Sequence, residues 1–467
     1  MARLKDAFNI LRGKKPQTNK YAEAFFKLLG SGFTSYDSNA KTYLEDGYGI
    51  NADVYSVIQQ MATKTVSIPY YVKRIKDEQA KSQLTRLRQS TKHNYNPRQY
   101  IKSKVLETKA FEEKELPFPL DRPNPTQTWG DVFALYKTFM RTTGNFYLYM
   151  LSPEDGINKG VPMHCYVLPS HLMQIVLKKD VDLMGNESPI SHYILTEGTS
   201  FVEFEAENVI HVKFANPFFD FEGSHLYGLS PLKAALKNIQ SSNEALTNNI
   251  KTMQNGGAFG FLHSKGNAPL QPEQAKELKD RMMEMDASPE RLSKIAGVSA
   301  EIGFTRIALN TDELKPFDYL KYDQKAICNV LGWSDKLLNN DEGAKYSNVN
   351  EFRKQVVTDN IIPDLNLLEE ALEESFLPRF KGYENTVIDW DYSELPEMQD
   401  DMEKLSKICN DEVDRGIISR DEYRAAMRYP MLETPEMQVH TVSLGIQTLE
   451  DAILGVDMVG DLTIDEE

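Results

Sequence analysis

The segment SPLKAALKNIQSSNEALTNNIKTMQNGG, residues 230–257, governs the architecture of this chain, because it predicts one long helix with a marked start and end. Ser230 is a good N-cap and Pro231 is favoured at the first helical position, while the glycines at 256–257 end the helix. Apolar side chains recur at helical spacing, at Leu232, Leu236, Ile239, Leu246, Ile250 and Met253. About 25 residues at ~1.5 Å each predict a rod roughly 38 Å long.

The remaining face of this helix is polar but almost uncharged. It carries Asn238, Gln240, Ser241, Asn243, Asn248 and Asn249. Small polar side chains allow close approach in a wet environment, so we expect this face to pack beside copies of the same helix.

The chain before the helix predicts a mixed α+β domain with an antiparallel sheet. Residues 55–71 indicate an amphipathic helix that runs into a strand, and residues 129–140 indicate a second helix. Short strands are predicted at 146–151, 164–168, 172–177, 191–195, 201–204 and 209–214.

The chain after the helix predicts a small α/β insertion over 257–316, a second helix over 318–331 that ends at Gly332, and a polar loop over 333–346. A third long helix is expected over 347–376, with a kink near Asn360 because Pro363 lies inside its pattern. A strand at 386–391 leads into an acidic helical region, where Ser419 and Glu422 have capping-box spacing.

Composition excludes several classes of protein. The 467 residues carry a net charge of −16 and are 41% hydrophobic, which indicates an ordered globular chain. No run approaches ~18 consecutive apolar residues, so we expect no membrane-spanning helix, and the basic N-terminus lacks the apolar core of a secretory signal. The cysteines at 165, 328 and 409 are too dispersed for a disulfide framework or a structural zinc site.

The charge is unevenly distributed along the chain. Residues 1–120 carry a net +9, residues 121–391 a net −12, and residues 392–467 a net −13. The most basic stretch, 73–104, holds ten positive and two negative residues. This composition favours a solvated, partly flexible loop, and the alternative is a segment that binds an acidic partner or nucleic acid. The overall acidity argues against a simple DNA-coating protein, but not against one past which DNA slides.

Candidate catalytic and metal-binding groups are few. The chain has no phosphate-binding loop, no nucleophile elbow and no zinc-protease motif, and the GxGxxA string at 47–52 follows no apolar strand. His164, His171, His192 and His211 lie on neighbouring predicted strands without ligand spacing, and Asp389 and Asp391 share one strand face. Hydrogen-bonded histidines and an exposed strand face explain these residues more simply. A cytosolic metal-dependent hydrolase remains the alternative to a structural or conduit protein.

Nine short motifs occur along the chain, and their order is more informative than any one of them alone. They are RPNP at 122–125, GNFY at 144–147, VIHV at 209–212, GLSP at 228–231, NGGA at 255–258, ICNVLGW at 327–333, YSN at 346–348, IP at 362–363 and GIIS at 416–419. In this order the chain resembles the portal proteins of tailed double-stranded DNA bacteriophages, from about residue 50 to about residue 432. It departs from them in the basic insertion 73–104 and at Trp333, Ser334 and Asp335, where the family usually has Val-Pro-Pro.

The resemblance implies an α+β fold that forms a ring, usually of twelve copies, at one vertex of the capsid. Carried over by position, 1–227 and 347–391 would form the wing, 228–256 and 317–332 the two stem helices, 257–316 the clip, 333–346 the tunnel loop and 392–467 a helical crown. The acidic crown would face packaged DNA and repel it, and the basic stretch would lie on the outer wing.

The resemblance also implies partners and sites, but neither a catalytic centre nor a cofactor. Expected partners are further copies of the chain, the terminase large subunit, the major capsid protein, head-completion or adaptor proteins, and double-stranded DNA passing through the channel. The protein would belong to the virion and assemble in the host cytoplasm. Candidate DNA-channel residues in the tunnel loop are Lys336, Asn339, Asn340 and Lys345. Candidate partner-docking residues in the clip are Lys276, Lys279, Arg281 and Arg291. For both sets, an ordinary solvated surface is the alternative.

Overall fold

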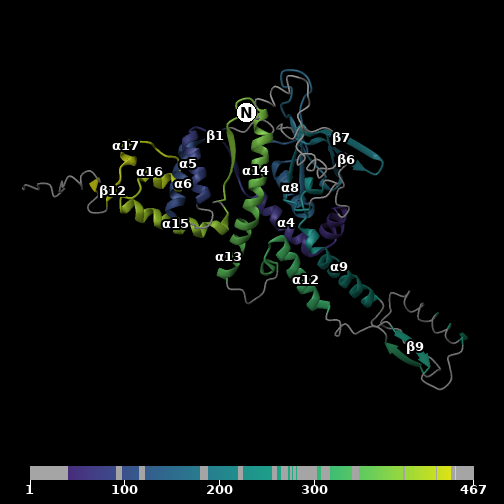
Figure 1. The fold of residues 1–467 in the computed structure, drawn as a ribbon. Helices are drawn as coiled ribbons and strands as arrows, with labels where there is room; N and C mark the ends of the chain where they lie inside the picture. Colours follow the sequence, from purple (N-terminus) through teal and green to yellow (C-terminus); the bar gives the residue numbers. More distant parts are fainter. Residues whose placement is uncertain are drawn as a thin grey trace, which may run out of the picture.

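The computed structural model describes residues 40–90, 97–114, 121–178, 188–218, 224–254, 260–264, 272–273, 276, 280, 302–306, 316–338, 346–392, 395–427, 429–442 and 447–448. These residues form a mixed α+β body from which two helices project (Figure 1). Among them, no helix is both long and apolar enough to cross a membrane.

The centre of the body is a helical layer beside a three-stranded sheet. After α3 (Ala40–Thr42) and the π-helical turn η1 (Tyr43–Gly49), α4 (Ala52–Val66) packs against α8 (Trp129–Thr143). The sheet has the order β11-β1-β2, from β1 (Tyr70–Ile75), β2 (Phe111–Lys114) and β11 (Thr386–Trp390). β1 and β11 are antiparallel, with Tyr70 opposite Trp390. Segments from both ends of the chain therefore share one core.

Two further antiparallel sheets hold the six short strands predicted between residues 146 and 214. One sheet has the order β4-β3-β8, from β3 (Asn145–Leu151), β4 (His164–Leu168) and β8 (Val209–Lys213). The other has the order β5-β6-β7, from β5 (Met173–Leu177), β6 (Ile190–Glu197) and β7 (Ser200–Glu205). The 3₁₀ turn η2 (Ser170–Leu172) lies between β4 and β5, η3 (Ala206–Asn208) lies between β7 and β8, and η4 (Ser224–Leu226) follows β8.

The two projecting helices are α9 (Leu232–Gln254) and α12 (Pro316–Leu331), with the antiparallel strands β9 (Gly260–Ser264) and β10 (Ile302–Arg306) at their far end (Figure 1). They pack side by side, and Asn238 Nδ2 donates to Asp323 Oδ1 at 2.8 Å. Asn243 bonds to Asn51 and to the carbonyl of Asp46. Asn238 and Asn243 were expected to face copies of the helix, but they are hydrogen-bonded within the chain because α12 and η1 lie against that side.

The third long helix runs through the centre of the body and is interrupted by a π-helical turn. It consists of α13 (Tyr346–Val356), η7 (Val357–Ile361) and α14 (Ile362–Ser375). Pro363 has no N–H, and its ring would collide with the carbonyl four residues earlier in a regular helix. The wider turn η7 is the interruption predicted near Asn360. The chain then passes through η8 (Leu377–Arg379) to β11.

The basic stretch 73–104 is mostly helical, which differs from the flexible loop that the sequence favoured. It contributes to β1, α5 (Glu78–Ser90) and α6 (Pro97–Ala110). The C-terminal elements that follow β11 are α15 (Pro396–Asp414), α16 (Arg420–Ala426), α17 (Pro435–Gln438), β12 (Thr441–Val442) and β13 (Gln447–Thr448).

The basic stretch and the acidic C-terminal region, expected in different environments, lie against each other. α6 packs against α15 and α16, where Val105 joins Leu405 and Cys409 in a separate apolar cluster. Ion pairs fasten this assembly to the sheet: Lys73 Nζ lies 2.6 Å from Asp389 Oδ2 and 3.3 Å from Glu107 Oε1. Part of the positive charge of the stretch is therefore neutralised inside the molecule.

Candidate functional site

The candidate tunnel-loop and clip residues lie largely outside the described residues. Asn339, Asn340 and Lys345 fall outside them, as do Lys279, Arg281 and Arg291. Lys276 is described and exposed. Lys336 is exposed on the 3₁₀ turn η6 (Asp335–Leu337), with its Nζ 5.0 Å from the centre of the Phe352 ring of α13. The best-defined polar contacts near these candidates lie where α9 and α12 enter the body, at two groups of contacts called here the two joints.

The strand histidines and the β11 carboxylates do not gather around one point. His211 Nε2 lies 3.1 Å from Asn145 Oδ1, and the His192 Nδ1 lies 3.1 Å from the hydroxyl of Ser191. Asp389 is paired with Lys73. In the described part of the chain, no three His, Cys, Asp or Glu side chains are grouped so that they could hold a metal ion.

The root of α9 is locked to β3 by a close backbone approach. Gly144, which ends α8 with φ +76°, and Gly228 are so close that a Cβ on Gly228 would lie 1.9 Å from the Gly144 carbonyl oxygen. Ser230 Oγ donates to the carbonyl of Thr142 at 2.5 Å. No side chain larger than hydrogen fits at Gly228, so this contact fixes where the stem begins.

Asn145 supplies the polar contacts of this first joint. Its Nδ2 donates to the carbonyls of Thr143 and Gly228, and its Oδ1 accepts the Gly228 N–H at 2.6 Å. The same Oδ1 is the partner of His211, which also stacks on Tyr147 with ring centres 4.3 Å apart. Burial lowers the pKa of His211 to about 3, and the nearby Lys213 acts in the same direction. His211 is thus a neutral structural donor at physiological pH.

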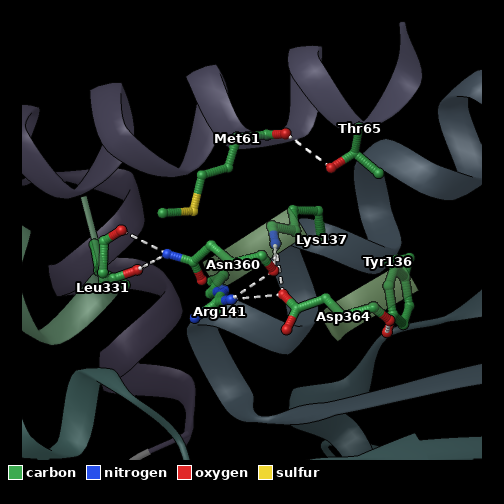
Figure 2. Close-up of polar contacts among 9 residues, drawn as sticks. Met61, Thr65, Tyr136, Lys137, Arg141, Leu331, Asn360 and Asp364 are labelled. Atoms are coloured by element: carbon green, nitrogen blue, oxygen red, sulfur yellow. Dashed lines mark hydrogen bonds and ion pairs between the residues drawn. The ribbon is translucent and has the colours of Figure 1, made fainter. Parts of the chain in front are cut away.

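The root of α12 is held by a second joint, centred on Asn360 in the π-helical turn. Asn360 Nδ2 donates to the carbonyls of Leu331 and Gly332, at 2.9 and 2.6 Å (Figure 2). Gly332 has φ +69°, and a Cβ there would come within 2.3 Å of Asn360 Nδ2. The amide thus satisfies carbonyls that the helix end leaves without intrahelical partners.

A buried charge cluster lies directly behind Asn360. Asp364 Oδ2 accepts from Lys137 Nζ at 2.5 Å and from Arg141 Nη2 at 2.6 Å, and both cations also contact the Asn360 carbonyl (Figure 2). Tyr136 donates to the carbonyl of Asp364 at 2.5 Å. Burial lowers the pKa of Lys137 to about 7, Arg141 adds to this effect, and Asp364 opposes it. One carboxylate therefore serves two cations.

The two joints bring together segments that are far apart in the sequence but belong to the motifs singled out from it. The first unites GNFY at 144–147, VIHV at 209–212 and GLSP at 228–231, and the second unites ICNVLGW at 327–333 with IP at 362–363. Sequence reasoning identified these motifs but missed that they meet. The contacts at both joints are hydrogen bonds and close packing, which are typical of a structural protein with a firmly held helical projection.

Comparison with known proteins agrees with that class. A model of the family described as "Phage portal protein" matches residues 97–427. The chain therefore belongs to the phage portal protein family.

Individual relatives are distant. An uncharacterized protein of Rickettsia felis is 24% identical over 341 residues, which cover 71% of this chain and 83% of the relative. Two structures of the neck of a gene transfer agent particle are each 19% identical and cover 86% of this chain and 97% of theirs. Their TM-scores are 0.57 for the empty particle, computed with C6 symmetry, and 0.56 for the native particle, computed with C12 symmetry. At these identities the likeness concerns the fold.

Proposed function

We propose that this protein forms a ring of twelve copies at one vertex of a phage capsid and that DNA enters and leaves through the centre of the ring. The observation that carries the proposal is the family match over 97–427, which includes both roots of the stem. The neck structure computed with C12 symmetry supports a twelve-membered ring. In a closed ring each copy offers two different surfaces to its neighbours, so every subunit must hold its stem at the same angle. The two joints meet that requirement.

The proposed partners follow from the place of the ring in the particle. The terminase large subunit would dock on the clip during packaging, adaptor or head-completion proteins would replace it, and the major capsid protein would surround the wing. The protein would reside in the virion after assembly in the host cytoplasm. Lys276 is exposed and lies in the sequence between β9 and β10, so a docking partner can reach it.

We infer that the chain acts without a catalytic centre of its own. The hydrolase alternative requires the strand histidines, yet His211 is hydrogen-bonded to Asn145 and its pKa is lowered by burial, and Asp389 is paired with Lys73. Elemental analysis of the purified protein tests this alternative. We expect less than about one tenth of a metal ion per chain, whereas one bound ion per chain would support the hydrolase alternative.

The ring is tested by negative-stain microscopy and mass measurement of the full-length protein. Twelve copies of the 53.3 kDa chain give a particle of about 640 kDa with a central hole. A monodisperse monomer at all protein and salt concentrations, and in the presence of a capsid scaffold, would overturn the proposal.

The tunnel-loop assignment is tested separately with the double variant Lys336→Ala/Lys345→Ala. Rings are expected to form normally while DNA packaging falls, because the loop would lose its weak phosphate contacts. The matched control is Lys159→Ala/Lys381→Ala, which removes two exposed lysines from the body. Equal packaging by both double variants would remove the assigned role of the loop lysines.

A further inference from the structure

The cluster behind Asn360 carries more positive charge than its surroundings neutralise. The side chains of Lys137, Arg141 and Asp364 are 0%, 10% and 6% exposed. Arg141 Nε is buried and has no hydrogen-bond partner among the described residues. The nearby α4 contributes the neutral side chains of Met61 and Thr65 (Figure 2). Burying a second cation without its own counter-charge is unfavourable, so the cluster holds its elements together at an energetic cost.

The same cluster holds the two parts of the chain that flank residues 333–345. Through its main chain, Asn360 is bound by the cations of α8, and through its side chain it binds the carbonyls of Leu331 and Gly332 at the end of α12. The π-helical turn that contains it is the point where α13 departs from the regular path of α14. Turns of this kind are often found at functional sites. One residue therefore connects the end of α12 to the turn that follows α13.

We propose that Lys137, Arg141, Asp364 and Asn360 form a latch, and that opening it releases the end of α12 and the α13–η7 segment together. When the cations withdraw from the Asn360 carbonyl, the turn loses the contact that holds its position. Its amide then leaves the two α12 carbonyls. α8 and α14 remain in place, whereas the released segment withdraws Leu331, Val357 and Ile361 from the main core that it shares with them. The proposal goes beyond ring formation and concerns each subunit by itself.

Hydrogen exchange followed by mass spectrometry tests the latch on the full-length protein, with every variant in the same assembly state. In the wild type, peptides covering 325–333 and 346–361 are expected to open at one common rate, faster than peptides of α8 and α14. Asn360→Ala should accelerate both peptides by about tenfold, the effect of losing about 1.4 kcal/mol. Lys137→Met, which removes the bond from Nζ to the Asn360 carbonyl but keeps the volume, should also accelerate both.

Ser230→Ala is the matched control, since it removes a hydrogen bond of the other joint and should leave both peptides unchanged. Acceleration of only one peptide by Asn360→Ala would overturn the proposal, and so would unchanged exchange of both peptides in Lys137→Met. If a variant fails to fold, the wild type alone decides, because two different opening rates for the peptides exclude a common latch. Ring microscopy of the same samples separates this outcome from a failure of the portal assignment.

Discussion

Replacing Gly228 with alanine should disrupt the first joint through steric collision alone. The new Cβ would lie 1.9 Å from the Gly144 oxygen, 2.8 Å from its carbonyl carbon and 2.9 Å from the Phe214 nitrogen. Relief needs a shift of about 1 Å, because real Cβ contacts closer than roughly 3 Å are not tolerated. That shift breaks the bond from the Gly228 N–H to Asn145 Oδ1 and the bond from the Phe214 N–H to the Gly144 carbonyl. Two such bonds, one of them reaching a buried side chain, contribute about 2–5 kcal/mol together.

Thermal unfolding of the full-length protein measures this effect. A loss of that size should lower Tm by about 2–5 °C in a chain of 467 residues. The control is Gly49→Ala, where the nearest atom to the new Cβ is the Leu44 oxygen at an ordinary 3.4 Å, so Tm should change by no more than about 1 °C. If the two variants melt within 1 °C of each other, the close approach does not hold the stem and the reasoning fails.

Three further perturbations have distinct expected outcomes. The pKa of Lys137 is lowered to about 7 from 10.5, so between these pH values the folded state binds fewer protons than the unfolded state. The free energy of unfolding should therefore rise with pH in this range. Lys137→Met should flatten that rise in denaturant titrations, and an equal pH dependence in wild type and variant would contradict the lowered pKa of Lys137. Ser419→Ala removes an observed capping box and should destabilise α16 by about 1 kcal/mol, seen as faster amide exchange confined to 420–427; unchanged exchange would count against the cap. Glu107→Gln removes the negative charge that Lys73 and Lys104 share. It should lower Tm by a few degrees at low salt and by less at high salt. A change in Tm that does not depend on salt would indicate that Glu107 acts through packing and not through its charge.

Most of the fold could be predicted from the sequence because its signals are local. The helix predicted after Ser230 is α9 (Leu232–Gln254), and the interruption near Asn360 follows from the ring of Pro363. The alternating strands between residues 146 and 214 also lie where their pattern placed them. Each of these features is decided by residues within a few positions of one another.

What the sequence could not supply depends on partners distant in the chain. The stretch 73–104 looked like a loop because its charges gave no sign that Lys73 meets Asp389 or that Val105 meets Leu405. The two joints could not be predicted for the same reason. Asn145 and Gly228 look like ordinary turn residues in the sequence, and their contact is formed only in the folded chain. The sequence around Lys137 did not indicate that its side chain is buried, because its partners Asn360 and Asp364 lie more than 200 positions away.

The rooting of the stem has a mechanical consequence. α9 spans 23 residues, or about 34 Å at 1.5 Å per residue, and it acts as a lever whose fulcrum is the glycine contact at its base. A tilt of about 10° there would sweep the tip through about 6 Å, farther than a hydrogen bond can stretch. In the proposed ring, twelve such helices would surround one opening, and any looseness at their bases would make its rim uneven. The absence of a side chain at Gly228 would then help to keep that rim regular.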